Sequence, residues 1–279
     1  MNRPLRTLAL TAATLIAALA FAQETPMKET PKGQYAQVNG LKMYYEIHGT
    51  GKPLVLLHGS FGTADGWSTI LPTLEKERQM IVVELRGHGR TEGVETPLTP
   101  EAMADDTAAL LKHLKIEKAD VFGYSMGGKV ALALAIRHPE AVRKMAILGA
   151  AMGSMKDTFT AEAYNQFLSI TPENFNFAAV KDPYTKVSPH PEKWPDLVKG
   201  IVEGGRSFKG FTEEQVRGIQ APTLVMLGDR EGIKLEHVVE MYRTLPNAQL
   251  AIFSKADHFL LYTGADRVLG TLVPFLEAE

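Results

Sequence analysis

A serine between two glycines is the first feature of this sequence that could do chemistry. Residues 123–127 read GYSMG, with Ser125 at the centre of a G-x-S-x-G pattern. The pattern directly follows a short apolar run and directly precedes a helical pattern, so it falls on a sharp strand–turn–helix that would lift the Ser125 hydroxyl above a sheet. The helix N-terminus adds free N–H groups and a favourable dipole. This context favours a nucleophilic serine over an inert serine in a glycine-rich turn.

Short apolar runs and helical patterns alternate around this serine. Asn39-Gly40 separates residues 35–38 from 43–47 with the turn chemistry of a β-hairpin. Later runs without polar alternation are typical of strands buried on both faces of a parallel sheet; they cover residues 54–57, 80–83, 119–122, 144–148, 223–227 and 250–253. Helices are predicted after Thr99 through residue 114, at 130–136 and 235–245, and at 266–276, where Pro274 would either kink the helix or interrupt it. This order predicts one doubly wound α/β domain.

One long segment interrupts the alternation. Residues 151–221 separate two predicted strands by far more than one crossover helix requires, and they hold nine of the chain's 22 aromatic residues. We interpret this segment as a mostly helical cap over the carboxyl edge of the sheet, with some aromatics lining an apolar pocket and others forming the core of the cap. The core α/β domain would then comprise residues 34–150 and 222–279.

Three motifs resemble those of the α/β-hydrolase fold family, in that family's order. They are LLHGS at residues 56–60, LRGHGRT at 85–91 and GYSMGG at 123–128. The resemblance extends over about residues 34–276. It implies an α/β fold with a mostly parallel eight-stranded sheet covered by helices on both faces, a helical cap inserted after the sixth strand, and a Ser…acid…His triad. The motifs are specific for the fold and the mechanism but not for a substrate.

The chain order of this triad places the general base after Ser125. Four histidines follow the serine. His138 ends the helix after the serine, His190 lies between two prolines, and His237 falls inside a predicted surface helix. Only His258 lies in a loop just after the last predicted strand, so we predict that it is the base.

The acid is expected in the loop after the strand at 223–227, which reads GDREG at residues 228–232. The position that matches the family's usual aspartate holds Glu231, whose extra methylene a shift of the loop must accommodate. Asp229 is the alternative, with a shorter side chain at a less usual position. Either carboxylate would fix the tautomer of His258 and stabilise its imidazolium form.

Backbone donors must face the carbonyl oxygen on which negative charge develops. Met126, directly after the nucleophile, supplies one N–H, and the resemblance implies that Ser60 supplies the second. We expect His58 to order its loop without touching a proton in the reaction. Glu84 stands where relatives commonly carry aspartate, and it is expected to bond nearby backbone or Arg86.

The N-terminus has the features of a cleavable secretion signal. Arg3 and Arg6 precede an uncharged apolar run at residues 7–20, and AFA at 20–22 is a small-x-small cleavage site. The run has about 14 residues, whereas a membrane anchor needs about 20. We therefore expect residues 1–22 to be a signal peptide, residues 23–33 to be a flexible mature N-terminus, and the protein to be secreted or periplasmic.

Composition excludes several classes of partner. Two of the 30 basic residues lie in the signal and none of the 32 acidic ones, so 28 against 32 remain and the net charge is −4. This charge supports neither nucleic acid nor an anionic membrane as partner. Without cysteine or an H-E-x-x-H motif, no metal is predicted, and no G-x-G-x-x-G follows a strand, so no cofactor is predicted either.

These features predict a serine hydrolase that cleaves a small apolar ester or lactone through an acyl-Ser125 intermediate. A carbon–carbon bond hydrolase and a cofactor-free perhydrolase or haloperoxidase-like enzyme are the enzymatic alternatives, because both resemble the same nucleophile motif. A non-catalytic binding protein on the same fold is the alternative of a different class. The sequence specifies neither the natural substrate nor the oligomeric state.

Overall fold

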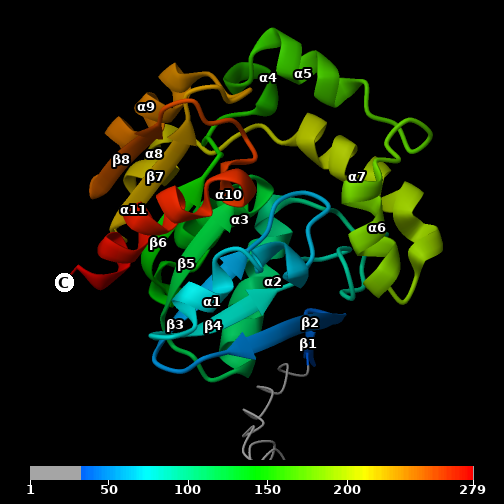
Figure 1. Ribbon diagram of the computed structural model, residues 1–279, viewed down its shortest axis with the longest axis horizontal. Coiled ribbons are helices and arrows are strands. Elements are labelled where there is room, and N and C mark those ends of the chain that lie inside the picture. Colours follow the sequence, from blue (N-terminus) through cyan, green and yellow to red (C-terminus); the bar gives the residue numbers. More distant parts are fainter. Residues whose placement is uncertain (1–32, 279) are drawn as a thin grey trace, which may run out of the picture. The chain divides into compact units, whose positions relative to one another are not determined.

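A computed structural model describes residues 33–278 (Figure 1), so the predicted signal peptide and nearly all of the predicted flexible segment lie outside the described residues. The strands form one sheet in the order β1-β2-β4-β3-β5-β6-β7-β8. The β1–β2 and β2–β4 pairs are antiparallel and all other neighbours are parallel. The mostly parallel eight-stranded sheet predicted from the sequence is confirmed. Its strands are β1 (Gln34–Val38), β2 (Leu41–His48), β3 (Lys52–Leu57), β4 (Arg78–Val83), β5 (Ala119–Tyr124), β6 (Val142–Leu148), β7 (Thr223–Gly228) and β8 (Ala248–Phe253).

The first two strands form the hairpin that the Asn39-Gly40 pair predicts. Val38 pairs with Leu41, which leaves a two-residue turn. Both turn residues have positive φ angles, 48° at Asn39 and 79° at Gly40, as a type I′ turn requires.

Helices cover both faces of the sheet (Figure 1). The side chains of β3 show why: Val55 and Leu57 pack into one buried cluster with residues of α2, α3, α8 and α9, whereas Leu54 and Leu56 pack into another with residues of α1, α10 and α11. A strand buried on both faces therefore reads as a continuous apolar run. The helices outside the long segment are α1 (Leu71–Leu74), α2 (Pro100–His113), α3 (Met126–Arg137), α9 (Leu235–Thr244), α10 (Leu260–Thr263) and α11 (Ala265–Glu277).

Two predicted elements differ in detail from the structure. β8 was expected to be buried on both faces, but Ile252 is 39% exposed and only the last residue of the strand is buried. The reason is that β8 lies at the edge of the sheet and pairs with β7 alone. α11 continues through Pro274 to Glu277.

The segment between β6 and β7, residues 149–222, is called the inserted segment below. It contains α4 (Met155–Thr158), α5 (Ala161–Leu168), α6 (Ala178–Val187), α7 (Trp194–Ser207) and α8 (Glu213–Arg217). In Figure 1 α4 and α5 lie above the sheet, and α6 and α7 lie at its right. The Thr160 N–H donates to the Gly232 carbonyl at 2.9 Å and the Lys234 N–H to the Thr158 carbonyl at 2.8 Å, so the loop after β7 holds this segment in place. Within residues 33–278, no helix is both long and apolar enough to cross a membrane.

Candidate active site

The turn between β5 and α3 holds Ser125 in a strained backbone conformation. Its φ and ψ angles are 55° and −118°, a combination that costs energy for a residue with a side chain. The flanking glycines permit this turn, because a Cβ at Gly127 would lie 1.9 Å from the carbonyl oxygen of Leu57, and one at Gly123 would lie 2.3 Å from the Gly127 carbonyl oxygen. The Ser125 N–H donates to the Leu148 carbonyl at 2.8 Å, which fixes the turn against β6. The glycines of the G-x-S-x-G pattern are thus needed for backbone contact.

The structure brings Ser125, His258 and Glu231 into one hydrogen-bonded chain. The Nε2 atom of His258 lies 2.9 Å from Ser125 Oγ, and its Nδ1 atom lies 2.8 Å from Glu231 Oε2. The Glu231 side chain is 2% exposed and that of His258 is 36% exposed. Because a carboxylate only accepts hydrogen bonds, Nδ1 carries the proton in the neutral ring. Nε2 is then free to accept the Ser125 hydroxyl proton.

Glu231 rather than Asp229 reaches the histidine. Gly149, just after β6, leaves the space for the longer side chain, since a Cβ there would lie 3.0 Å from Glu231 Oε1 and 3.3 Å from His258 Cε1. Asp229 Oδ1 instead accepts a hydrogen bond from the Ala256 N–H at 3.1 Å. Hydrogen bonds from backbone N–H groups, chiefly that of Lys255, lower the pKa of Asp229. Asp229 therefore stabilises the loop before His258 and does not contact the histidine ring.

Tyr124 holds the other side of that loop, a contact that the sequence analysis missed. Its hydroxyl donates to the His258 carbonyl at 2.7 Å, and the two rings lie 5.3 Å apart between centroids. Tyr124 is 5% exposed. Tyr124, the residue before the nucleophile, therefore fixes the backbone of the base. Nothing in the local sequence pattern distinguishes this role from that of a core tyrosine.

The two predicted oxyanion-hole donors lie beside the serine. Ser60 and Met126 both line the cavity into which Ser125 opens, and a Cβ at Gly59 would be 3.1 Å from the Ser125 Cβ. Within the described part of the chain, neither the Ser60 N–H nor the Met126 N–H has a hydrogen-bond acceptor. Two free backbone donors beside a nucleophile can receive a carbonyl oxygen.

His58 is held in the neutral form beneath this turn. Its Nδ1 donates to the Gly59 carbonyl at 2.7 Å, and its Nε2 accepts from the Leu85 N–H at 3.0 Å. Burial, with a smaller contribution from His88, lowers the pKa of His58 to about 3. Both ring nitrogens are therefore occupied in ordering the loop that carries Ser60.

Glu84 bonds nearby backbone, as expected, but its ion pair is not with Arg86. The carboxylate is buried and accepts hydrogen bonds from the N–H groups of Ala64 and Arg90, at 3.0 and 2.5 Å. Its ion pair is with the Arg90 guanidinium at 2.6 Å, not with Arg86, because Arg86 binds Asp106 at 2.7 Å. Burial raises the pKa of Glu84.

A cavity of about 80 Å³ opens beside Ser125. The inserted segment contributes six apolar side chains to its wall, and three of these are aromatic. They are Ala150, Met155, Phe159, Phe167, Ile201 and Phe208. Other aromatics of this segment pack against one another, as Tyr184 and Trp194 do with ring centroids 5.5 Å apart. The segment thus supplies both a pocket wall and a core.

Lys129 also lines this cavity, and the sequence analysis did not single it out. It lies on α3 four residues after Ser125, the spacing that places two side chains on the same face of a helix. Burial lowers the pKa of its ammonium group to about 8. The four-residue spacing from Ser125 is the sequence signal that could have identified Lys129.

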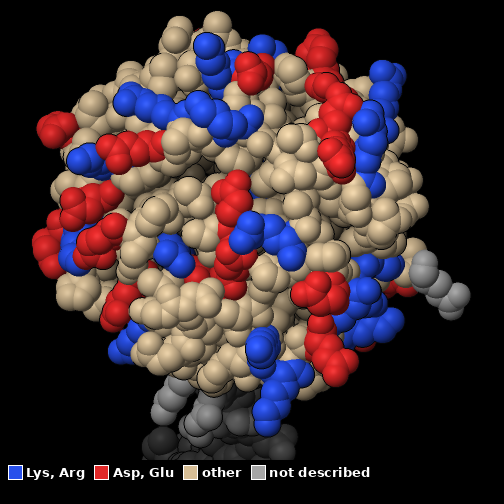
Figure 2. All heavy atoms as spheres, turned by 180° about the vertical axis from the view of Figure 1, so that it is seen from behind, with Lys and Arg blue, Asp and Glu red and all other residues tan. Residues whose placement is uncertain are grey.

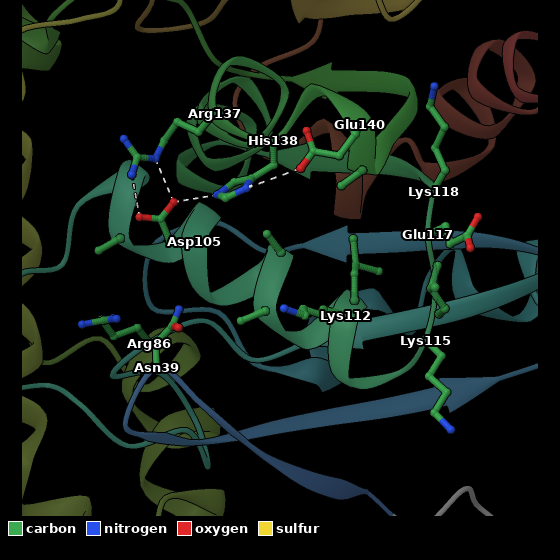
Figure 3. A pocket seen from close by; sticks show the side chains of 16 residues that line it. Asn39, Arg86, Asp105, Lys112, Lys115, Glu117, Lys118, Arg137, His138 and Glu140 are labelled. Atoms are coloured by element: carbon green, nitrogen blue, oxygen red, sulfur yellow. Dashed lines mark hydrogen bonds and ion pairs between the residues drawn. The ribbon is translucent and has the colours of Figure 1, made fainter.

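A larger groove of about 1250 Å³ lies elsewhere, over α2 and the C-terminal end of α3 (Figure 3). Three of its polar side chains pair with one another: Asp105 binds Arg137 and His138, each at 2.7 Å. Neither Ser125 nor His258 lines this groove. It has no part in the hydrogen-bonded chain described above.

Acidic and basic side chains are interspersed over the face shown in Figure 2, in keeping with the net charge of −2 of the whole chain. Among residues 33–278, no three His, Cys, Asp or Glu side chains are grouped so that they could hold a metal ion.

Comparison with known proteins identifies the family. A sequence model described as the alpha/beta hydrolase fold matches residues 52–193, and the chain belongs to this family. The 2-hydroxymuconate semialdehyde hydrolase of Pseudomonas sp. strain CF600 is 27% identical over 282 residues, covering 90% of this chain and 96% of that protein. The non-heme haloperoxidase of Rhodococcus erythropolis is 25% identical, covering 86% and 97%. The crystal structure of the enol-lactonase from Burkholderia xenovorans has a TM-score of 0.72 at 23% identity, covering 88% and 100%; this likeness concerns the fold.

Proposed function

We propose that this protein is a serine hydrolase that cleaves a small ester or lactone through an acyl-Ser125 intermediate. The observation that carries the proposal is the chain from Ser125 Oγ through His258 to the buried Glu231 carboxylate, with distances of 2.9 and 2.8 Å. A nucleophile, an oriented base and a fixed carboxylate are the parts that acyl transfer requires.

In the acylation step, Ser125 Oγ attacks the substrate's carbonyl carbon while its proton moves to His258 Nε2. The carbonyl oxygen becomes an oxyanion facing the Ser60 and Met126 N–H groups, where one such donor typically contributes about 2.7–4 kcal/mol to the transition state. Glu231 stabilises the imidazolium. Collapse of the intermediate breaks the bond to the leaving oxygen, which takes the proton from His258 and departs as an alcohol or, from a lactone, as the free end of the opened ring.

In the deacylation step, a water molecule gives a proton to His258 and its oxygen attacks the acyl carbon. The bond to Ser125 Oγ breaks, and the proton returns from His258 to the serine. The products are a carboxylic acid and the original enzyme. Because His258 must be neutral to accept each proton, hydrolysis should fall as acid protonates the ring.

Cleavage of a carbon–carbon bond is the second candidate, and the relative named 2-hydroxymuconate semialdehyde hydrolase favours it. The same residues would serve, but His258 would deliver its proton to a carbon leaving group. The haloperoxidase relative favours a perhydrolase, in which hydrogen peroxide in place of water attacks the acyl carbon and gives a peracid. Both alternatives also need Ser125.

The test is hydrolysis of p-nitrophenyl esters with acyl chains of two to eight carbons, by wild type, Ser125→Ala and Ser68→Ala. Ser68 is an exposed serine on the loop after Trp67 and serves as the matched control. We expect Ser125→Ala to lose activity by roughly 10⁴-fold or more, and Ser68→Ala to retain it. Turnover that survives in Ser125→Ala would refute the serine mechanism. Folded wild type that turns over none of the esters would refute ester hydrolysis and direct the assay to carbon–carbon substrates and peroxide.

A further inference from the structure

Lys129 is the one charged side chain on the wall of the cavity beside Ser125. The other lining residues of the described chain are apolar, glycine or serine, and none is acidic. Lys129 is half-buried and its Nζ lies 4.9 Å above the centroid of the Phe208 ring. An ammonium group over an aromatic ring gains a cation–π attraction, but this contact leaves its three N–H groups without acceptors.

No protein acceptor binds this ammonium group. Among the described residues, no hydrogen bond or ion pair reaches Lys129 Nζ. The buried carboxylate of the site, that of Glu231, pairs with His258 instead. Burying a cation without a counter-charge is costly, which is why the pKa of Lys129 falls to about 8. At neutral pH most of the population still carries the charge. An unpaired cation held in an apolar pocket is therefore arranged for an anion that arrives with a ligand.

The position of the cavity indicates which part of the substrate meets Lys129. The leaving group must lie next to His258 Nε2, because it receives its proton there. Ser60, Ser125 and Met126 line the cavity but His258 does not. The cavity therefore extends from the serine on the side away from the base, where the acyl part of the substrate lies. Its volume of about 80 Å³ indicates that the acyl part is short.

We propose that the acyl part of the substrate ends in a carboxylate that binds Lys129, so that the preferred substrates are monoesters of short dicarboxylic acids. This inference rests on the proposed ester hydrolysis and adds the charge of the substrate to it. Lys129 acts as a specificity-determining residue: it orients the acyl chain from its far end while the carbonyl group lies between Ser125 and the two backbone donors.

The experiment compares two esters with the same leaving group: p-nitrophenyl butyrate, whose acyl chain is neutral, and the mono-p-nitrophenyl ester of glutaric acid, whose chain ends in a carboxylate. The measured quantity is the ratio of kcat/KM for the glutarate ester to that for the butyrate ester. The proteins are wild type, Lys129→Met, Lys129→Arg and Lys112→Met. Lys112 is an exposed lysine of α2 in the groove of Figure 3, and its replacement removes the same charge at a distance.

We expect wild type to prefer the glutarate ester and Lys129→Met to lower the ratio by about 10- to 100-fold, the effect usual for a charge-assisted hydrogen bond in a desolvated site. Lys129→Arg should retain part of the preference, and Lys112→Met should leave the ratio at the wild-type value. An equal ratio in wild type and Lys129→Met would overturn the proposal, as would an equal decrease in Lys112→Met.

A binding measurement separates this proposal from the proposed function. Calorimetry would compare the glutarate ester with Ser125→Ala and with the double variant Ser125→Ala/Lys129→Met. Weaker binding to the double variant, by about 10-fold or more, would support the Lys129 contact even if wild type hydrolysed neither ester. Equal binding of the ester to both proteins, or no binding to either, would overturn it.

Discussion

Glu231→Gln is the substitution that tests the proposed catalytic chain most sharply. The glutamine side chain would be nearly the same size as that of the glutamate and would keep an oxygen near His258 Nδ1, now 2.8 Å from the Glu231 carboxylate, but it would carry no charge. The change removes the stabilisation of the imidazolium that forms when His258 takes the serine proton. It also lets the amide NH₂ face Nδ1 and select the wrong tautomer of the ring.

The expected magnitude follows from the geometry. His258 Nδ1 and Glu231 Oε2 are in hydrogen-bond contact at 2.8 Å, and unit charges about 4 Å apart attract by about 4 kcal/mol at an effective dielectric constant of about 20. The Glu231 side chain is almost fully buried, whereas that of His258 is 36% exposed, so solvent weakens the attraction to about 3 kcal/mol. This energy corresponds to a decrease in kcat of about 10²- to 10³-fold.

The assay is kcat for p-nitrophenyl butyrate at a pH on the wild-type plateau, with Asp229→Asn as the matched control and circular dichroism to confirm folding. Asp229 contacts the Ala256 N–H and not the histidine, so its replacement should decrease kcat less than 10-fold. Glu231→Asp keeps the charge but shortens the reach, and it should fall between these two variants. An equal loss of activity in Asp229→Asn and Glu231→Gln would contradict the role of Glu231, as would a Glu231→Gln variant nearly as active as wild type.

Two further predictions concern the residues that the sequence analysis missed. Tyr124→Phe leaves the His258 carbonyl without its 2.7 Å donor, and we expect kcat to decrease about 3- to 10-fold with little change in KM. This decrease corresponds to the loss of one hydrogen bond of about 1 kcal/mol that holds the base in position. A lower melting temperature with unchanged kcat would show that the hydroxyl only stabilises the fold. Because deprotonation removes the charge of Lys129 above its pKa of about 8, the ratio of kcat/KM between the glutarate and butyrate esters should decrease as the pH rises from 7 to 9, and a ratio that stays constant over this range would contradict a charged contact.

The sequence predicted the sheet and the nucleophile turn because both depend on local patterns. Apolar runs mark buried strands, and the two glycines around Ser125 are needed by contacts within the same turn and with the neighbouring β3. The exposure of β8 could not be predicted in this way, since it depends on the place of the strand in the sheet and not on its own residues.

The choice between Glu231 and Asp229 stayed open in the sequence for a similar reason. The longer side chain fits because Gly149, at the end of β6, leaves space for its carboxylate. These residues are far apart in the chain, and only the pairing of β6 with β7 brings them together. A departure from the usual aspartate is therefore compatible with the same geometry when a glycine faces it.

Lys129 also affects how the selectivity experiment must be interpreted. A cation four residues after Ser125 on the same helix adds to the positive potential at the start of α3 and so stabilises any oxyanion formed on the substrate. Replacing it should therefore slow both esters, the neutral one through this field and the carboxylated one through the field and the lost contact together. The field affects the two reactions equally because both develop the same charge on the same carbonyl oxygen. It cancels in the ratio, and what remains in the ratio is the binding of the distant carboxylate by Lys129.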